Sequence, residues 1–416
     1  MSEAKPSTEG LAARQAALNM LDAVLRRGQM LDSAAQKAAA PDRPLALAIA
    51  GETLRRLPEL DQLIDSATWQ RLPDDSKARM VLRLALAQRI ALNVPDHALV
   101  ATALPLVDGG PRRLVHGVLG TLLRRGVAGG AATLLPEAVE ARWSAAWGDE
   151  AVASGRLAMV RRPPLDLSFA DALAAEAFAA ANGGVSLASG HVRLQGGAAV
   201  TDLPGFNEGG WWVQDLAASL PARLMPQAPS RVLDLCAAPG GKTMQLAAAG
   251  HTVTALDRSA SRLARLSENM ARTGLRTETI AADALEWRGG PFDAVLLDAP
   301  CSATGTFRRH PEVLYRARPP VIAELSELQS RLLKHAATLV SPGGTLIYAV
   351  CSLEPEEGER IVEAVQDLTL DPIGAEELPP GIVPHERGWV RVLPGMLEAE
   401  GGLDGFFIAR LVRPLA

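Results

Sequence analysis

Two of the chain's three cysteines follow predicted strands, where a thiol could act as a nucleophile. Cys301 belongs to the run Asp298-Ala-Pro-Cys, directly after an apolar strand predicted over 292–297. Cys351 closes a second apolar strand, predicted over 345–350. Because the carboxyl ends of parallel strands meet at one edge of a sheet, we expect both thiols at that edge. The thiolate is the reactive form of a cysteine, and nearby positive charge promotes it.

A thiol at such an edge suits methylation of an unreactive carbon if an adenosine-type cofactor binds beside it. Carbon 5 of a pyrimidine is a poor nucleophile until a group adds to carbon 6. A thiolate that adds there creates an enamine-like intermediate, which can take a methyl group from S-adenosylmethionine. An acid near N3 stabilises the developing charge, and a base then removes the carbon 5 proton so that the thiol can leave. The spacing leaves open which thiol attacks.

A glycine-rich turn follows the first strand of this region, predicted over 231–235. Within residues 234–243 (DLCAAPGGKT), Gly240 and Gly241 let the backbone turn tightly beside a ligand, and the next helix offers free N–H groups. A P-loop requires glycine where Cys236 stands, and the dinucleotide motif G-x-G-x-x-G is absent. The turn therefore favours an adenosine-type cofactor whose neutral parts need backbone contact.

Aspartates follow the next two predicted strands. Asp257 ends the strand predicted over 252–256, and Asp283 follows the short run Ile-Ala-Ala at 280–282. A carboxylate at the second strand end can accept hydrogen bonds from both ribose hydroxyls, and Asp283 is expected near the adenine edge. Each aspartate alone fits a solvated turn or a helix cap equally well. Their positions at successive strand ends, together with the glycine turn, favour a cofactor site.

The elements that would position these residues alternate along the second half of the chain. Apolar strands are predicted over 231–235, 252–256, 292–297 and 345–350, helices over 261–273 and 321–340, and a final edge or hairpin strand over 406–412. Strands that alternate with helices predict a doubly wound α/β sheet whose ligands bind at the carboxyl ends of the strands.

The first part of the chain has a different pattern. Between residues 11 and 125 the apolar residues recur at helical spacing, which predicts an all-helical domain over 1–130. Residues 131–215 begin with a Gly/Ala-rich stretch and mix helices with short strands. We interpret them as a linker and a small α+β segment, and we assign residues 216–416 to the α/β domain.

Charge is distributed unevenly over the 416 residues, whose total is −5. Residues 1–130 carry 17 Lys and Arg against 13 Asp and Glu, a net charge of +4, and the remainder carries −9. A mildly basic helical domain can contact RNA phosphates, and the pairs Arg112-Arg113 and Arg124-Arg125 are the candidates.

Composition indicates a soluble globular protein, with 48% hydrophobic and 21% charged residues. The cysteine spacing predicts neither a disulfide framework nor a zinc site, so we expect no metal. Residues 1–10 are polar, without the apolar stretch of a signal peptide, and no apolar run has membrane-spanning length. These features predict a cytoplasmic protein that binds no membrane.

Several motifs together resemble one family. They are residues 212–215 (WVQD), 234–243 (DLCAAPGGKT), 298–301 (DAPC), 308–311 (RRHP), 351–352 (CS), 354–357 (EPEE) and 405–411 (GFFIARL). Over roughly residues 155–413 the chain resembles the Nop/Sun family of RNA cytosine-5 methyltransferases. Residues 8–130 resemble a NusB-type RNA-binding domain, and the pairing is similar to Sun-type bacterial 16S rRNA methyltransferases. The implied fold is a Rossmann-like S-adenosylmethionine-dependent methyltransferase domain, preceded by an all-helical NusB-like domain and a small α+β segment.

The resemblance assigns the cofactor residues. The family's cofactor loop falls on Cys236, Ala237, Ala238, Pro239, Gly240, Gly241 and Lys242. The ribose-binding acid falls on Asp257 and the adenine-side acid on Asp283, while Asp298 lies where cofactor and base meet. We expect Cys236 itself to be a small packing residue in this loop.

The resemblance also assigns the catalytic residues. The nucleophile maps to Cys351, Cys301 assists product release, and Asp298 contacts the base. Two positions depart from the family: Val350 replaces a usual Thr, and Ala303 replaces a usual Gly. Neither change removes a catalytic group.

These features predict a monomeric enzyme that methylates carbon 5 of a cytosine in 16S rRNA through a covalent cysteine–cytosine intermediate. The base must leave its stack to reach a thiol, so single-stranded or looped RNA fits, with residues 308–310 (RRH) along the RNA path. One alternative is a non-catalytic RNA-binding protein that retains the cofactor fold, which loss of a strand-end cysteine would favour. The other, an NAD-dependent oxidoreductase, is disfavoured by the missing G-x-G-x-x-G.

Overall fold

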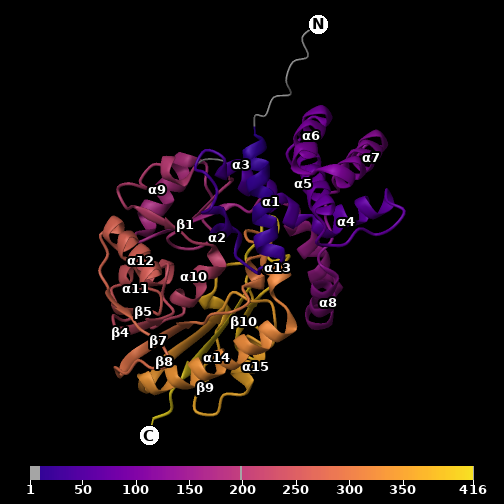
Figure 1. Ribbon diagram of the computed structural model, residues 1–416. Coiled ribbons are helices and arrows are strands. Elements are labelled where there is room, and N and C mark those ends of the chain that lie inside the picture. The colour runs from indigo at the N-terminus through magenta and orange to yellow at the C-terminus, as the bar shows by residue number, and fades with distance from the viewer. Residues whose placement is uncertain (1–9, 197–198, 416) are drawn as a thin grey trace. The chain divides into compact units, whose positions relative to one another are not determined.

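The computed structural model describes residues 10–196 and 199–415 and divides the chain into two units (Figure 1). The helical unit contains the chain up to Arg161 together with Phe307–Arg316, and the sheet unit contains Arg162–Thr306 and the chain from Ala317 onward. Residues 131–161 therefore group with the helices and residues 162–215 with the sheet. Residues 1–9, part of the polar stretch in which we expected no signal peptide, lie outside the described residues.

The helical unit is built around one buried helix. Its elements are α1 (Leu11–Leu25), α2 (Leu31–Ala35), α3 (Arg43–Arg55), α4 (Leu57–Ser66), α5 (Lys77–Ala91), α6 (Asp96–Ala103), η1 (Leu104–Leu106), α7 (Gly109–Arg125), α8 (Glu137–Val160) and α13 (Val313–Arg316). Helix α5 begins after Ser76, whose hydroxyl caps it by accepting a hydrogen bond from the Arg79 N–H. The helix is buried from residue 78 to residue 88 and packs against α1, α3, α4, α6 and α7.

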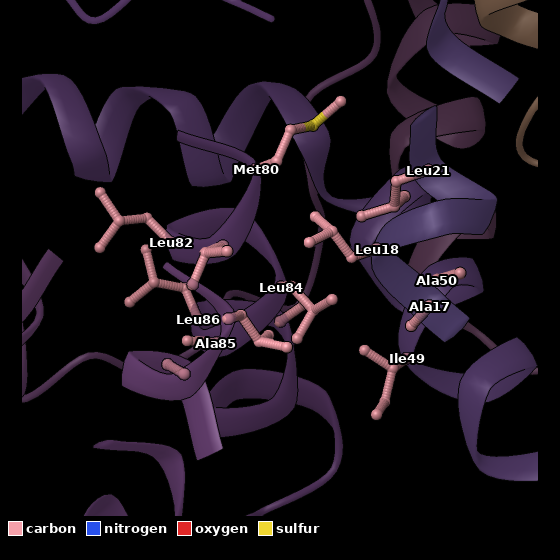
Figure 2. Close-up of a cluster of buried hydrophobic side chains, with 14 of the residues drawn as sticks. Ala17, Leu18, Leu21, Ile49, Ala50, Met80, Leu82, Leu84, Ala85 and Leu86 are labelled. Atoms are coloured by element: carbon pink, nitrogen blue, oxygen red, sulfur yellow. The ribbon is translucent and has the colours of Figure 1, made fainter. Parts of the chain in front are cut away.

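Aliphatic side chains fill the space around α5. Figure 2 shows Leu18 and Leu21 of α1, Ile49 of α3, and Leu84 and Leu86 of α5 in this cluster. Leu18 and Leu21 are three residues apart and lie on one face of α1. Leu84 and Leu86 are two residues apart and lie on different sides of α5, which is buried all round from residue 78 to residue 88. The helical spacing of apolar residues in the sequence therefore corresponds to the packed faces of these helices.

Buried charges hold α4 to α5. Arg79 is fully buried and donates to Asp65 at 2.7 Å and to Asp61 at 3.0 Å. Arg83 is nearly as buried and donates to Asp61 at 2.7 Å. A buried guanidinium is stable only when its N–H groups are paired, so these contacts fix the register of the two helices.

The segment 307–316 belongs to the helical unit although its neighbours on both sides in the chain belong to the sheet unit. The Leu31 N–H donates to the buried carboxylate of Glu312 at 3.1 Å, and the Tyr315 hydroxyl donates to the Leu54 carbonyl at 2.8 Å. The rings of Phe307 and Trp143 pack edge to face, 5.3 Å apart. These contacts anchor the segment on α2, α3 and α8.

The sheet unit begins with a small antiparallel sheet. Strand β1 (Leu165–Phe169) lies between β2 (His191–Leu194) and β3 (Trp211–Val213), and α9 (Ala172–Asn182) packs on it. Asp166 of β1 is buried, and its two carboxylate oxygens accept hydrogen bonds from Nε and Nη2 of Arg193, each at 2.7 Å. Burial raises the pKa of Asp166, but hydrogen bonds from Arg193 and His191 more than offset this and hold that pKa well below its usual range.

The large sheet has parallel strands in its centre and antiparallel strands at one side. Its strands are β4 (Arg231–Leu235), β5 (Thr252–Asp257), β6 (Glu278–Ala281), β7 (Phe292–Asp298), β8 (Val340–Val350), β9 (Thr369–Leu370), β10 (Val390–Val392) and β11 (Phe406–Val412). The helices of this part of the chain are α10 (Leu216–Arg223), α11 (Gly241–Ala248), α12 (Ala260–Thr273), α14 (Pro319–Leu339) and α15 (Glu359–Glu363), with the short 3₁₀ turns η3 (Thr304–Thr306) and η4 (Ala375–Glu377). A further 3₁₀ turn, η2 (Val200–Asp202), lies between β2 and β3 of the small sheet. Among the described residues the strand order is β10-β11-β8-β7-β4-β5-β6, and β9 also pairs with β11. The chain runs outward from β4 to β6 and returns to β7 on the other side of β4, so the order reverses between β4 and β7. Ligands of doubly wound sheets bind at such a reversal.

Alternating side chains cover the two faces of this sheet. Leu233 and Val295 are buried in one cluster with residues of α14 and α15, and Val232 and Leu296 in another with residues of α10 and α11. Strands that are buried on both faces have nearly continuous apolar sequences, and the sequence shows this pattern at these strands.

The predicted fold class is confirmed: a doubly wound α/β unit follows a helical unit and a small α+β segment. The strand expected over 406–412 is present and pairs antiparallel with the preceding β10, as a hairpin strand does, but an edge position is wrong. Strand β11 pairs with β8 on one side and with β10 on the other, so it lies inside the sheet. The three-residue β10 was too short to recognise in the sequence.

Candidate active site

The cofactor loop lies between β4 and α11. Cys236 has a positive φ of 61°, and Gly240, at 107°, precedes the helix. A Cβ at Gly240 would lie 2.7 Å from Leu266 Cγ, so both the conformation and the close packing require glycine there. The turn directs the first N–H groups of α11 toward the carboxyl edge of the sheet.

Asp257 ends β5 beside this loop. One of its carboxylate oxygens accepts the Ala238 N–H at 3.2 Å, and the other accepts the Ser259 N–H at 2.9 Å. Each oxygen keeps further acceptor capacity, which a pair of ribose hydroxyls could use. Asp283 is exposed two residues beyond β6, and β6 pairs directly with β5. The two acids therefore lie at the same edge, as an adenosine ligand requires.

A cavity of about 320 Å³ opens next to the cofactor loop. Its lining includes Ala237, Ala238, Pro239, Gly241, Lys242 and Asp298 from the predicted site, with Phe206, Trp212, Gln214 and Arg272 from the surrounding segments. Asp257, Asp283, Cys301 and Cys351 are not among its lining residues. The structure thus joins Asp298 and Lys242 to the loop in one cavity and leaves the two acids on the neighbouring strands outside it.

The two strand-end thiols lie side by side. The Sγ atoms of Cys301 and Cys351 are 3.5 Å apart. Strands β7 and β8 are parallel neighbours, and beyond their ends the Gly305 N–H donates to the Cys351 carbonyl at 3.0 Å. A Cβ at Gly305 would lie 2.0 Å from the Gly405 carbonyl oxygen, so only glycine permits this approach.

A lysine supplies positive charge at this edge. Lys242 Nζ donates to Asp298 Oδ2 at 2.8 Å, and the Lys242 side chain is only 11% exposed. Burial lowers the pKa of Lys242, but Asp298 and then the Cys351 sulfur offset that effect, so the pKa is raised overall. The sequence had assigned Lys242 to the cofactor loop alone; the pairing with Asp298 depends on two loops 56 residues apart and was not foreseen.

The three thiols differ in environment. Burial raises the pKa of Cys236 to about 12, which supports a packing role for that side chain. The hydrogen bond with Cys351 and then burial raise the pKa of Cys301 well above its usual value. Cys301 thus lies neutral beside Cys351, and the Cys351 sulfur in turn acts electrostatically on Lys242.

Asp234, next to the cofactor loop, was not selected as a candidate from the sequence. It is fully buried at the end of β4, and its Oδ2 accepts the Thr243 hydroxyl at 2.6 Å. Its Oδ1 has no hydrogen-bond partner among the described residues. Burial is the largest cause that raises the pKa of Asp234 to about 7. The sequence feature that could have indicated Asp234 is an acidic residue within the apolar run that forms β4.

The basic run at 308–310 is not arranged as expected. Arg308 is only 4% exposed, and its carbonyl accepts a hydrogen bond from Arg55 within the helical unit. Arg309 and His310 are half-buried. The prediction that Arg308 lines an RNA path therefore does not fit its burial. The arginines of α7, by contrast, are exposed at both ends of that helix.

Fold and site together define a class. A sheet that reverses its order between β4 and β7, a glycine turn before α11, and acids at the ends of β5 and β7 are the features of a Rossmann-like S-adenosylmethionine-dependent methyltransferase. Residues 221–412 match the family model described as 16S rRNA methyltransferase RsmB/F, and residues 11–124 match the NusB family. The chain belongs to the RsmB/F family of methyltransferases, and its cofactor is S-adenosylmethionine.

Relatives match over almost the whole length. The chain is 36% identical to ribosomal RNA small subunit methyltransferase B of Xanthomonas campestris over 99% of this chain and 100% of the relative. It is 33% identical to the protein of the same name from Pseudomonas syringae over 97% and 96%. A solved methyltransferase homologue from Pyrococcus horikoshii has 28% identity and a TM-score of 0.55, and covers 71% of this chain and 98% of its own.

Within residues 10–196 and 199–415, no group of three or more His, Cys, Asp or Glu side chains is arranged to hold a metal ion. Over the same ranges, every helix is too short or too polar to cross a membrane.

Proposed function

We propose that this enzyme methylates carbon 5 of a cytosine in small-subunit rRNA through a covalent bond between Cys351 and carbon 6 of the base. The observation that carries this proposal is the pair of thiols 3.5 Å apart at the edge that also holds Lys242 and Asp298. A base methylated at nitrogen or oxygen has no need of a thiol nucleophile. The names of the relatives support small-subunit rRNA as the substrate.

Cys351 is the residue that attacks. Its thiol loses a proton and its sulfur bonds to carbon 6, so that carbon 5 becomes nucleophilic. Lys242 stabilises the thiolate. The proton lost by the thiol is taken up at N3 of the ring, and Asp298, whose carboxylate oxygens accept, is assigned to hold the resulting N3–H. When bound, S-adenosylmethionine supplies the methyl group. The cofactor loop, Asp257 and Asp283 would hold it.

Cys301 assists the release of product. Carbon 5 loses its proton, the electrons of that C–H bond re-form the carbon 5–carbon 6 double bond, and Cys351 leaves as a thiolate. The largest cause of the raised pKa of Cys301 is the Cys351 thiol. That thiol no longer exists once its sulfur is bonded to carbon 6, so Cys301 becomes easier to ionise at the stage where a base is needed.

The RNA is contacted by both units. The target cytosine must be unstacked to reach Cys351, which favours a single-stranded or looped region. The exposed arginines of α7 supply phosphate contacts that are independent of sequence. All proposed catalytic and cofactor residues come from the sheet unit of one chain, which supports action as a monomer.

A trapping experiment tests the assignment. Cys301→Ala is expected to accumulate an RNA–protein adduct that migrates slowly on denaturing gels, because attack proceeds while release fails. Cys351→Ala is expected to form no adduct and no product while binding S-adenosylmethionine normally by titration calorimetry. The double variant should behave as Cys351→Ala. An adduct in Cys351→Ala would overturn the assignment, and methylation at a position other than carbon 5 would overturn the reaction.

A further inference from the structure

A buried polar cluster joins the two cysteine loops. Ser302 follows Cys301, and Ser352 follows Cys351. Both serines are buried, and their hydroxyl oxygens are 3.1 Å apart. Glu357, also fully buried, lies against both of them.

Hydrogen-bond donors from three segments converge on the Glu357 carboxylate. Its Oε1 accepts the Ser302 N–H at 2.8 Å and the Gln329 side-chain amide at 3.0 Å. Its Oε2 accepts the Ser352 hydroxyl at 2.5 Å and also the Ser302 hydroxyl. The carboxylate thus bridges the residue after one catalytic thiol to the residue after the other.

Glu357 is itself held in place. The Tyr348 hydroxyl, from the interior of β8, donates to the Glu357 carbonyl at 2.6 Å. Gln329 of α14 donates both to Glu357 and to the Pro300 carbonyl at 2.9 Å, beside Cys301. Backbone and side chain of Glu357 are therefore fixed to the sheet and to the helix that covers it.

We propose that Glu357 is a positioning residue that sets the separation of the Cys301 and Cys351 thiols. The inference rests on the proposed function, because it matters only if one thiol attacks and the other assists release. The thiols lie on different loops, and a displacement of about 1 Å at a reacting group can cost a factor of about 100 in rate. Together with the Gly305–Cys351 backbone bond, the Glu357 bridge ties the two loops to each other directly beside the thiols.

Glu357→Gln separates this role from simple filling of space. Glutamine has the same volume, but it replaces one acceptor oxygen with an NH₂ group that can accept nothing from the Ser302 N–H or from the serine hydroxyls. The serine hydroxyls can then only accept from the new NH₂ group, so their charge-assisted bonds to a carboxylate are lost and the loops can shift relative to each other. Glu356→Gln is the matched control, because Glu356 precedes Glu357 in the same motif, is partly exposed and pairs with Arg360 at 3.0 Å.

The expected result is a selective defect. Glu357→Gln should lower kcat about 10- to 100-fold, leave KM for RNA and for S-adenosylmethionine little changed, and accumulate covalent adduct, because Cys301 no longer lies correctly for release. Glu356→Gln should match the unsubstituted enzyme. Ser302→Ala and Ser352→Ala each remove one arm and should show smaller defects of the same kind, which keeps the test decisive if Glu357→Gln does not fold.

Thiol proximity gives a readout that needs no RNA. Mild oxidation with diamide, a two-electron oxidant that is itself reduced to the hydrazine, should form the Cys301–Cys351 disulfide rapidly in the unsubstituted protein and more slowly in Glu357→Gln. A variant with normal kcat and normal disulfide formation would overturn the proposal. The proposal would also be overturned if the activity of Glu357→Gln fell only in proportion to the fraction of folded protein and no adduct accumulated. If Cys351→Ala forms an RNA–protein adduct, the proposed function fails. If Cys301→Ala traps the adduct, Cys351→Ala does not, and Glu357→Gln changes neither kcat nor the rate of disulfide formation, only this inference fails.

Discussion

Lys242 Nζ lies 2.8 Å from Asp298 Oδ2, and this pair joins the cofactor loop to the loop that carries Cys301. The two residues come from opposite sides of the point where the strand order reverses, since one follows β4 and the other ends β7. The Lys242 cation acts electrostatically on Cys351, and Asp298 Oδ1 takes no part in the contact with Lys242.

Replacement of Lys242 tests the role of this cation. Lys242→Met should lower kcat about 100-fold, because both the thiolate and the charge that develops on the ring lose a stabilising partner. It should also slow the alkylation of Cys351 by iodoacetamide, measured by mass spectrometry at a fixed neutral pH. Lys334→Met, on the exposed face of α14, is the matched control and should alter neither rate. Equal alkylation of Cys351 in both variants would contradict the proposed electrostatic role.

Gly305→Ala should disturb the contact between the cysteine loops. Its Cβ would lie 2.0 Å from the Gly405 carbonyl oxygen, so the backbone must move and the Gly305–Cys351 hydrogen bond is displaced. We expect a loss of stability of about 1–3 kcal/mol and a lower kcat at saturating RNA, measured by thermal unfolding and by methyl incorporation. Gly117→Ala on α7, where a Cβ meets nothing within 4 Å, should instead be neutral or stabilising. Wild-type kcat in Gly305→Ala would show that the loops tolerate displacement.

The buried Asp234 predicts a pH dependence of stability. Because its pKa is raised to about 7 from an unfolded value of 3.8, the folded chain holds this proton more tightly than the unfolded chain. The stabilising contribution is complete below about pH 4 and is lost as the pH rises through about 7, with a magnitude on the order of 4 kcal/mol.

Asp234→Asn cannot ionise, so its unfolding temperature should rise relative to that of the unsubstituted protein as the pH increases from about 5 to about 8. The exposed Asp367→Asn should show no such trend. Parallel pH profiles for all three proteins would mean that Asp234 does not titrate in this range.

The arginines of α7 should control RNA affinity and its salt dependence. Changing Arg112 and Arg113 to alanine should weaken RNA binding for any sequence and reduce the slope of log affinity against log salt by about 0.7–0.9 for each phosphate that is no longer neutralised. Filter binding over a salt series measures this. A double substitution of the exposed Arg318 and Arg331 in the sheet unit is the control. An unchanged slope in the α7 variant would remove this helix from the RNA interface.

Much of the sheet could be predicted because its strands are buried on both faces. Continuous apolar runs located β4, β7 and β11 to within one residue, and the polar residues that follow located the strand ends. Alternation of strands and helices was sufficient for the fold class, since a parallel sheet requires such crossovers. The three-residue β10 carries no periodic signal and was missed, so the sequence left open whether β11 is an edge or a hairpin strand.

The site was only partly predictable. Residue types and strand ends were enough to select Cys301, Cys351, Asp257 and Asp298 as candidates, because the carboxyl edge of a parallel sheet collects them. Side-chain partnerships across loops, such as those of Lys242, depend on distances that no local pattern contains. Arg308 was placed on the RNA path by its charge, whereas its burial depends on packing within the helical unit.

The path of the chain through segment 307–316 makes the two units inseparable by a single cut. A fragment that begins at Arg162 would still carry Phe307 and Glu312 but would lack Trp143 and Leu31, the groups that cover them. The helical fragment alone would lack the inserted segment and expose the surface on which it packs. Such a fragment pair is expected to be less soluble and less stable than the whole protein, so a fragment designed to contain either unit must account for segment 307–316.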